Sequence, residues 1–600
     1  MTLLEERSQS SPLPAHGRFS DPPTSRESRK TGSLDRLGRW AVTDSGLITL
    51  LCFGVYMTIA WFLDWHYLSF QEDSIARMAN GFYIIHSRDP HLAAVGFVWG
   101  PLTSIAVLPL LMFNSVWPAL ASHDVAGTTM SSVAMAGAVY QLNAMLREWR
   151  VGIPPRVVLT LFFALNPLIL LFGGNGMSEG WYVFLLLATT RYYTRWFRNG
   201  DLTSLVYAAC ALGIAYLDRN EPIAVAMVAA PVTLIVTYIR SDGIRKSRIW
   251  SGITDAVIFV IPIVTSFTAW AVMSYVITGQ AFLQFTSKYG NSYQLAAAHV
   301  PKGTISGRLI HEMQSIEYLA PAIPIILVLA VVAAIYRRNA LVIAVLAVVG
   351  AGAGFTLVTY LTDTTFPWFR FYILWVPIAV LLVGTLFSSP VRIRHITAEG
   401  NSHPLVPEFG GQSGSSSRKG FGAAFGSALA VVIAVLLLTP SIFGTMKGMD
   451  NASYAPDLVP YYGYIWHKHL DAQDQHARTQ YADIELISRY ISAQNFPIGD
   501  VVIDTGQDCV PNIVTNVTNP RVFVITNDRD YQRVLDDPLT FGAHFLVGAT
   551  GSLTDSVSQQ YPGLAKGVSW ARPVHTFSET YFCPKLTLYR VTGHPDGFGG

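Results

Sequence analysis

The chain has 600 residues, of which 51% are hydrophobic and only 13% are charged. So few charges, in a chain too long for one ordinary domain, exclude most soluble globular proteins and indicate a polytopic membrane protein. The net charge is only +2, and no long Lys/Arg run is present, so the sequence gives no sign of nucleic-acid binding.

The first 40 residues are rich in Ser, Pro and charge and contain no apolar core. This pattern predicts a disordered tail and not a signal peptide. Because the tail is basic and precedes the first apolar run, it favours a cytoplasmic N-terminus.

Eleven apolar runs are long enough to predict membrane-spanning helices. They lie near residues 45–65, 123–146, 156–173, 179–197, 203–217, 222–239, 253–278, 318–336, 340–360, 368–387 and 421–443. Together they predict a transmembrane module over residues 41–443.

The Arg and Lys residues indicate on which side each loop lies, because cytoplasmic loops carry an excess of both. A further apolar run at 100–120 would reverse every later loop if it crossed the membrane, and would place the Arg-rich loops outside. We therefore interpret 100–120 as a re-entrant or interfacial helix. Its three prolines, Pro101, Pro109 and Pro118, also suit a broken element better than a straight span.

This topology places a Gly- and Ser-rich linker at 388–420 in the cytoplasm. Two long loops, 66–122 and 279–317, then lie outside, together with the C-terminal residues 444–600. The chain is expected in the cytoplasmic membrane, in contact with membrane lipids on its apolar helices.

Residues 444–600 predict an extracytoplasmic α/β domain. A helix is expected at 481–494, where three isoleucines share one face. Four short apolar runs predict strands: 501–504, 521–526, 544–549 and 585–591. Cys509 and Cys583 both lie in this domain, and outside the cytoplasm they could form a disulfide or remain as thiols.

The stretch QEDSIARMANG at 71–81 places Glu72 and Asp73 at the outer membrane surface, directly after the first predicted helix. One interpretation is structural, because Asp is a good N-cap and suits the positive end of a helix dipole. The other is a general base, because a carboxylate beside lipid is costly unless it is paired or used.

Short external loops bring further polar side chains to the same face of the membrane. These are Asn175, Glu179, Asp218, Arg219, Glu221, Asp363 and Arg370. Several such loops at one level predict a shared cavity. Arg219 could instead pair with its acidic neighbours, and Arg370 could anchor the interface beside Trp368.

Four segments resemble the GT-C glycosyltransferases, membrane enzymes that use polyprenyl-phosphate sugars and include ArnT-like enzymes and protein mannosyltransferases. DSIARMANGFYIIHSRDPHL resembles the family's juxtamembrane helix, which begins with an acidic residue, and WGPL is similar to its PPL segment. NPLILLFGGNGMSEG resembles the membrane-exit segment that ends in a polar loop. WFRFYILWVP is similar to the helix start whose arginine faces the lipid phosphate. The resemblance covers roughly residues 45–390.

The resemblance implies a GT-C-like fold of about 11 transmembrane helices and an inverting sugar transfer from a polyprenyl-phosphate donor. By position, Asp73 matches the general base, with Glu72 as the adjacent alternative, and Arg370 matches the lipid-phosphate ligand. Further substrate contacts are expected from Arg219, Lys288, His91, Asn175 and Glu179. The loop 279–317 is expected to be mobile. No cofactor is required, although some members of the family use a divalent metal.

Two other classes of function remain open: a polytopic transporter, and a noncatalytic envelope scaffold with an external binding domain. Within the family, the sugar is open, and the acceptor could be a glycan, a lipid or a protein. The Gly-, Ala- and Arg-rich composition indicates a high-GC, actinobacterial source.

The predicted topology has a direct test. Phosphatase fused after residue 600 should be active, and phosphatase fused after residue 400 should be inactive, because alkaline phosphatase folds only outside the cytoplasm. Fluorescent-protein fusions at the same sites should give the reverse result. Phosphatase activity at 400 but not at 600 would contradict the topology.

Overall fold

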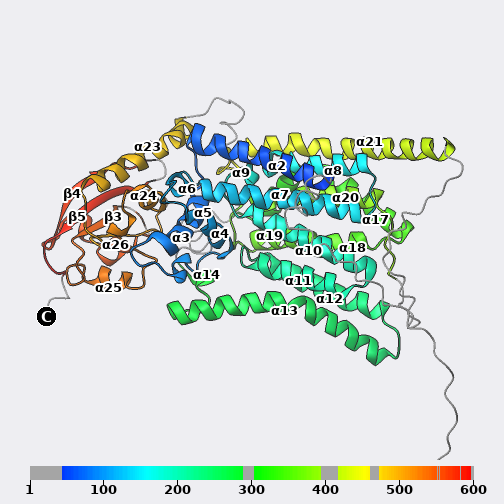
Figure 1. The fold of residues 1–600 in the computed structure, drawn as a ribbon, viewed down its shortest axis with the longest axis horizontal. Helices are drawn as coiled ribbons and strands as arrows, with labels where there is room; N and C mark the ends of the chain where they lie inside the picture. Colours follow the sequence, from blue (N-terminus) through cyan, green and yellow to red (C-terminus); the bar gives the residue numbers. More distant parts are fainter. Residues whose placement is uncertain are drawn as a thin grey trace, which may run out of the picture.

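The computed structural model describes residues 44–287, 303–393, 417–459, 472–507, 509–550, 552, 554–580 and 583–595. A bundle of helices runs along the long axis of the molecule, and the C-terminal domain covers one end of it (Figure 1). The helices α3 to α6 lie at this same end, between the bundle and the C-terminal domain. The predicted N-terminal tail, Lys288 and most of the linker lie outside the described residues.

Most bundle helices coincide with the predicted spans. They are α2 (Asp44–Trp61), α7 (Val125–Glu148), α8 (Ile153–Ala164), α9 (Pro167–Gly174), α10 (Glu179–Asn199), α11 (Leu202–Tyr216), α12 (Pro222–Arg240), α13 (Arg245–Thr278), α16 (Ile305–Leu319), α17 (Ile323–Arg337), α18 (Leu341–Val345), α19 (Ala351–Leu361), α20 (Trp375–Phe387) and α21 (Ser417–Met449). The π-helical turn η1 (Phe62–Tyr67) continues α2, η3 (Leu346–Gly350) joins α18 to α19, and the 3-10 turn η4 (Phe369–Tyr372) precedes α20.

Within the described residues, six helices are long and apolar enough to cross a membrane, or up to eight if each of two bent pairs is one span. The chain is therefore a multi-pass membrane protein, but the predicted number of eleven spans is not confirmed. The helices α7 and α10 are long but carry many polar residues, and most of their residues are buried. A helix that packs against other helices instead of lipid can carry more polar residues on its surface. Small polar residues also allow close helix packing.

Two predicted spans are bent instead of straight. The pair α8 and α9 bends by 63° at Asn166, whose side chain accepts a hydrogen bond from the Leu168 amide and so starts the second helix. The pair α16 and α17 bends by 76°. The span predicted at 318–336 therefore begins later, at Ile323, and α16 occupies the end of the loop predicted at 279–317.

The apolar run 100–120 forms three short helices, α4 (Leu102–Ala106), α5 (Leu108–Leu111) and α6 (Ala119–Ser122). The prediction of a broken element is confirmed. The helix predicted to begin near Glu72 is also present, as α3 (Glu72–His86).

The C-terminal domain contains a five-stranded mixed sheet in the order β2-β1-β3-β5-β4. Its strands are β1 (Val501–Ile503), β2 (Phe523–Ile525), β3 (Phe545–Thr550), β4 (Ala571–Phe577) and β5 (Lys585–Val591). The first three are parallel, whereas β5 is antiparallel to both of its neighbours. Strand β4 was not predicted, because it contains Pro573 and five of its seven residues are exposed, as suits an edge strand.

The remaining elements of this domain are helical. They are α23 (Ala472–Ala493), α24 (Val510–Asn516), α25 (Tyr531–Asp536) and α26 (Ser556–Gln560). Cys509, just before α24, and Cys583, just before β5, form a disulfide with a Cα–Cα distance of 5.2 Å. The two thiols considered in the sequence are thus paired in the structure.

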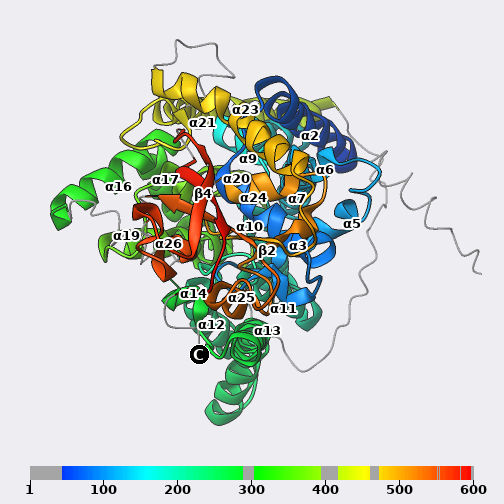
Figure 2. The ribbon, with the colours of Figure 1, turned by 90° about the vertical axis from the view of Figure 1, so that its left-hand side faces the viewer.

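The C-terminal domain shares one hydrophobic core with α3. This core contains Met78, Ala79, Phe82 and Tyr83 of α3, Ile484, Ile487 and Ile491 of α23, and Ile513 and Val514 of α24. Figure 2, which looks onto this end of the molecule, shows α23 and α24 in front of the bundle, beside α3. The domain and α3 therefore fold against each other.

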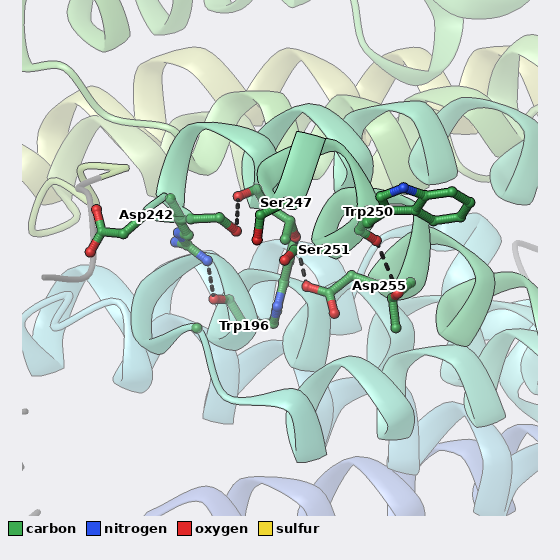
Figure 3. A pocket seen from close by; sticks show the side chains of 11 residues that line it. Trp196, Asp242, Ser247, Trp250, Ser251 and Asp255 are labelled. Carbon is green, nitrogen blue, oxygen red and sulfur yellow. Dashed lines mark hydrogen bonds between the residues drawn. The ribbon is translucent and has the colours of Figure 1, made fainter. Parts of the chain in front are cut away.

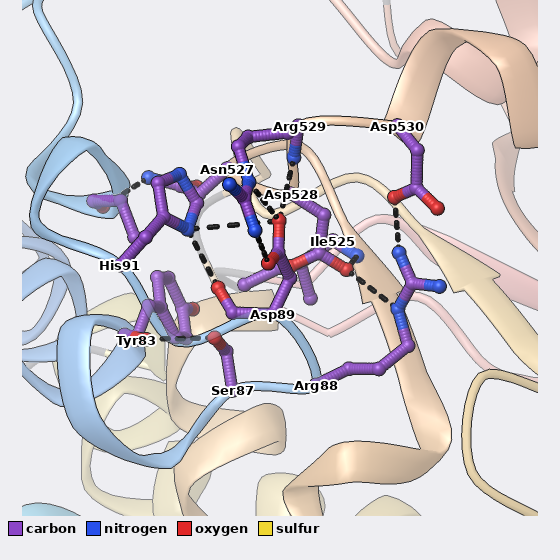
Figure 4. A network of polar contacts seen from close by, with 11 residues as sticks. Tyr83, Ser87, Arg88, Asp89, His91, Ile525, Asn527, Asp528, Arg529 and Asp530 are labelled. Carbon is purple, nitrogen blue, oxygen red and sulfur yellow. Dashed lines mark hydrogen bonds and ion pairs between the residues drawn. The ribbon is translucent and has the colours of Figure 1, made fainter.

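Reciprocal ion pairs extend this contact at the end of α3 (Figure 4). Arg88 lies between Asp528, at 3.1 Å, and Asp530 of the C-terminal domain. In the second contact the loop after α3 provides the carboxylate: Asp89 accepts a 2.9 Å hydrogen bond from the Nε of Arg529, in the C-terminal domain. Burial raises the pKa of Asp528 to about 6, against the opposing effect of Arg88. The side chain of Asp528 is 1% exposed, so its charge depends on Arg88.

Removal of Arg88 is expected to weaken the docking of the C-terminal domain. Arg88→Met leaves Asp528 buried without its cation, which costs up to about 3–5 kcal/mol. The double variant Arg88→Met/Asp528→Asn should recover part of this loss. The measurement is the melting temperature of the full chain in detergent. As a control, Arg529→Met removes an exposed cation and should change little. Equal losses for Arg88→Met and Arg529→Met would contradict this assignment.

Candidate active site

The site is built around an ion pair between two distant segments. Asp73 lies in the first turn of α3, and its Oδ2 accepts a 2.8 Å hydrogen bond from the Arg370 Nη2 of η4. The side chain of Arg370 is 5% exposed, whereas that of Asp73 is 34% exposed. The guanidinium is thus buried, whereas the carboxylate is partly exposed.

Arg370 has a second carboxylate and an aromatic ring close by. Its Nε lies 3.4 Å from the Oδ2 of Asp457, a residue that follows α21. Its guanidinium lies 4.4 Å from the ring centroid of Trp368 and 5.3 Å from that of Phe371. These contacts hold the guanidinium plane at the end of the bundle.

Arg219, in the turn between α11 and α12, lies against the same phenylalanine. Its guanidinium is 5.3 Å from the Phe371 ring. It also forms ion pairs with Glu179 at 2.9 Å and with Glu221 at 2.7 Å. Phe371 therefore joins Arg219 to Arg370, and the two cations belong to one cluster.

Arg77 is the third cation, one helical turn after Asp73 on α3. Its Nη1 lies 3.9 Å from the Met177 sulfur, and the Arg370 Nη1 lies 4.0 Å from the same atom. Its guanidinium also lies 5.3 Å from the ring of Trp99. We call Arg77, Arg219 and Arg370 the arginine cluster.

Two glycines allow the surrounding loops to approach closely. A Cβ on Gly100, in the WGPL segment, would lie 2.3 Å from the Leu217 carbonyl oxygen, just before Asp218. Gly176 has a φ of +77°, and a Cβ there would lie 1.9 Å from the Ser74 hydroxyl of α3. Both positions therefore require glycine.

The arginine cluster sets the charge state of Asp73. Burial acts to raise the pKa of Asp73, but the guanidinium groups of Arg370, Arg77 and Arg219 outweigh it and hold the pKa below its ordinary value. Asp73 is thus ionised at neutral pH.

Two neighbouring carboxylates behave differently. Burial raises the pKa of Asp218 to about 8, against the opposing effect of Arg77 and Arg219, and both of its carboxylate oxygens lack a hydrogen-bond partner. Burial also raises the pKa of Asp457 to about 6, although Arg370 opposes it. Asp73 is therefore the better candidate for a carboxylate that is charged and accessible.

The structure brings together five of the residues considered from the sequence: Asp73, Arg370, Arg219, Glu179 and Glu221. Glu72 is the first residue of α3. Asn175 is buried and accepts a hydrogen bond from the Met177 amide, so it shapes the loop that touches two of the arginines.

His91 lies apart from these contacts. It follows α3 and interacts with Asp89 where the end of α3 meets the C-terminal domain (Figure 4).

Arg77, Trp99 and Asp457 were not identified as site residues in the sequence analysis. The signal for Arg77 was its spacing of four residues from Asp73, which places both on one face of α3. In the part of the chain that the structure describes, no group of three or more His, Cys, Asp or Glu residues could hold a metal ion.

A separate cavity of about 640 Å³ lies near the ends of α10 and α12 and the start of α13 (Figure 3). It is lined by Trp196, Gly200, Thr237, Arg240, Ser241, Asp242, Ser247, Trp250, Ser251, Thr254 and Asp255. None of these residues belongs to the arginine cluster or to its carboxylate partners.

No protein-family model and no curated protein matches this sequence. Among solved structures, the chain is similar to ArnT from Cupriavidus metallidurans bound to undecaprenyl phosphate, with a TM-score of 0.50 and 13% identity. The match covers 91% of this chain and 98% of ArnT. At this identity, the likeness concerns the fold alone, and the chain thus shares the fold of this ArnT structure.

Two further GT-C glycosyltransferases match less well. The oligosaccharyltransferase of Archaeoglobus fulgidus has a TM-score of 0.40 and 12% identity, over 84% of this chain and 69% of its own. The mycobacterial arabinofuranosyltransferase AftD also has a TM-score of 0.40 and 12% identity, over 91% of this chain and 40% of its own.

Proposed function

We propose that this chain is a membrane glycosyltransferase. It transfers a sugar from a polyprenyl-phosphate donor to a cell-envelope acceptor, with inversion at the anomeric carbon. Asp73 is the general base, and Arg370 binds the phosphate of the donor. The acceptor is a glycan, a lipid or a protein of the envelope.

One observation carries this proposal: Asp73 and Arg370, 297 residues apart in sequence, are in direct contact at one end of the bundle. An accessible carboxylate and a planar cation at the end of a membrane-spanning helix are the two groups that this reaction needs. The fold supports the same conclusion, because ArnT, whose fold the chain shares, was crystallised with undecaprenyl phosphate.

The first step is binding of the donor. A polyprenyl chain remains in the lipid, so its phosphate lies at the membrane surface, where Arg370 stands at the start of α20. A guanidinium offers two parallel N–H groups to a phosphate, which fixes the orientation of the anion as well as its position. Arg77 and Arg219 add positive charge around it, which stabilises the leaving group as its charge develops.

The second step is the transfer. Asp73 accepts the proton of the acceptor hydroxyl, and the acceptor oxygen forms a bond to the anomeric carbon. The bond between that carbon and the phosphate oxygen breaks, and the polyprenyl phosphate leaves with the electron pair. Because attack and departure take place on opposite faces of the sugar, the configuration inverts.

The donor also makes Asp73 a stronger base. In the free protein, Arg370 holds the pKa of Asp73 below its ordinary value. A phosphate on Arg370 offsets this positive charge and raises the pKa of Asp73. A base whose pKa lies closer to neutral accepts a proton more readily in the transition state. The carboxylate is thereby activated when the donor is present.

The site lies, in this proposal, on the outer face of the cytoplasmic membrane, with the N-terminus inside and the C-terminal domain outside. The distribution of Arg and Lys supports this orientation. A transporter would instead move a substrate into proteoliposomes without forming a glycoside. A noncatalytic scaffold would keep its function after the loss of Asp73.

Asp73→Asn is expected to abolish most of the transfer. An amide cannot accept the proton, and loss of a general base costs about 10²–10⁴-fold in rate. Asn also caps helices well and Asp457 still pairs with Arg370, so the variant should fold, but with a lower melting temperature, because the buried Arg370 loses its hydrogen-bonded counter-ion. Turnover and melting temperature should be measured together.

Glu72→Gln is the matched control, because Glu72 precedes Asp73 by one residue, about 100° around α3. Its effect on turnover should be much milder. Normal turnover in Asp73→Asn would show that Asp73 only starts the helix, or that the chain is no glycosyltransferase.

The pH profile gives an independent check. Because Asp73 must be ionised to act, kcat/KM should fall as the pH decreases through its pKa. Arg77 helps to hold this pKa down, so Arg77→Gln should raise it and shift the acid side of the profile to higher pH. Arg489→Gln, which removes an exposed arginine of α23, is the control and should leave the profile unchanged. A profile that does not move in Arg77→Gln would argue against Asp73 as the titrating group.

A further inference from the structure

Asp457 contacts Arg370 from a segment that the sequence analysis did not place at the site. We call residues 454–458, between α21 and the C-terminal domain, the neck. The Phe369 amide donates a 2.9 Å hydrogen bond to the Tyr454 carbonyl oxygen, and Ala455 and Leu458 are both fully buried in the core of the bundle. The neck is therefore fixed against the start of α20.

The backbone around Asp457 is also tied to α3. The Gln71 side chain, directly before α3, donates a 3.3 Å hydrogen bond to the Asp457 carbonyl oxygen. The neck thus bridges the segments that carry Asp73 and Arg370. Its single carboxylate lies where both segments meet.

Two carboxylates share one guanidinium, but not equally. Asp73 forms a hydrogen-bonded ion pair with the Arg370 Nη2 at 2.8 Å. Asp457 lies 3.4 Å from the Arg370 Nε, and neither that nitrogen nor either oxygen of Asp457 has a hydrogen-bond partner. The contact of Asp457 is therefore electrostatic only and is the weaker of the two.

A buried guanidinium needs a counter-ion at all times. The Arg370 side chain is 5% exposed, and an unpaired charge at that depth would be costly. The donor is a phosphodiester with one negative charge, as is an ionised carboxylate. Replacement of Asp457 by the donor phosphate therefore keeps the charge around Arg370 constant, whereas replacement of Asp73 would remove the base.

We infer that Asp457 is a positioning residue that holds Arg370 until the donor arrives, and that the donor phosphate replaces Asp457 and not Asp73. This inference rests on the proposed function. After transfer, the product is a polyprenyl phosphate monoester with up to two negative charges. The return of Asp457 to Arg370 then competes with that product and favours its release. The neck thereby sets the affinity of the site for lipid phosphate.

The test is the affinity of the full chain for polyprenyl phosphate alone, measured in detergent without acceptor. Asp457→Asn removes the competing charge, so the dissociation constant should fall by about three- to tenfold, as expected for the loss of a partly buried ion-pair competitor. In turnover assays, the KM for the donor should also fall, whereas kcat should decrease because the product leaves more slowly. Asp457→Glu keeps the charge and should restore wild-type values.

Asp450→Asn is the matched control, because Asp450 is an exposed carboxylate just before the neck. It should change neither constant. Asp457→Ser provides a second neutral variant, and melting temperatures identify any variant that fails to fold. If the wild type binds polyprenyl phosphate but Asp457→Asn binds it no more tightly, this inference is wrong while the proposed function stands. If the wild type neither binds polyprenyl phosphate nor transfers sugar, both are wrong.

Discussion

The burial of one guanidinium, that of Arg370, constrains the rest of the site. A cation that is 5% exposed requires carboxylates beside it, and the chain provides Asp73 from α3 and Asp457 from the neck. Helix α3, η4 and the neck must therefore meet at one place. The shared hydrophobic core of α3 and α23 stabilises the same arrangement, so the C-terminal domain is part of the site's framework.

The same charges that stabilise the fold are suited to the proposed chemistry. A phosphate can take the place of a carboxylate on a guanidinium with little change in local charge. Arg77 and Arg219 lie close enough to hold the pKa of Asp73 down in the free protein. In the proposed mechanism, an anion bound beside them offsets their positive charge, so that substrate binding and activation of the base are coupled by electrostatics.

Much of this fold follows from patterns in the sequence. Apolar runs place most helices, and the prolines of 100–120 account for the break into α4, α5 and α6. Short apolar runs locate four of the five strands of the described sheet. The bend at Asn166 also has a local cause, because the Asn166 side chain caps the second helix of the pair.

The site was predictable only in part. Asp73 and Arg370 each lie near the start of a helix, next to a predicted span, where a charged residue has a local signature. Asp457 lies in the neck, which has no such signature, and it enters the site because the neck packs against Phe369. Long-range contacts of this kind cannot be read from spacing along the chain.

The central claim is that the chain transfers sugar from a polyprenyl-phosphate donor. It is tested most directly by incubating the purified full chain in nanodiscs with a panel of radiolabelled polyprenyl-phosphate sugars and membrane extracts as acceptor. NMR of the product then gives the anomeric configuration. We predict that one donor is consumed and that its sugar appears in a new glycoside of inverted configuration. Consumption of no donor, or a product that retains the donor's configuration, would contradict the account.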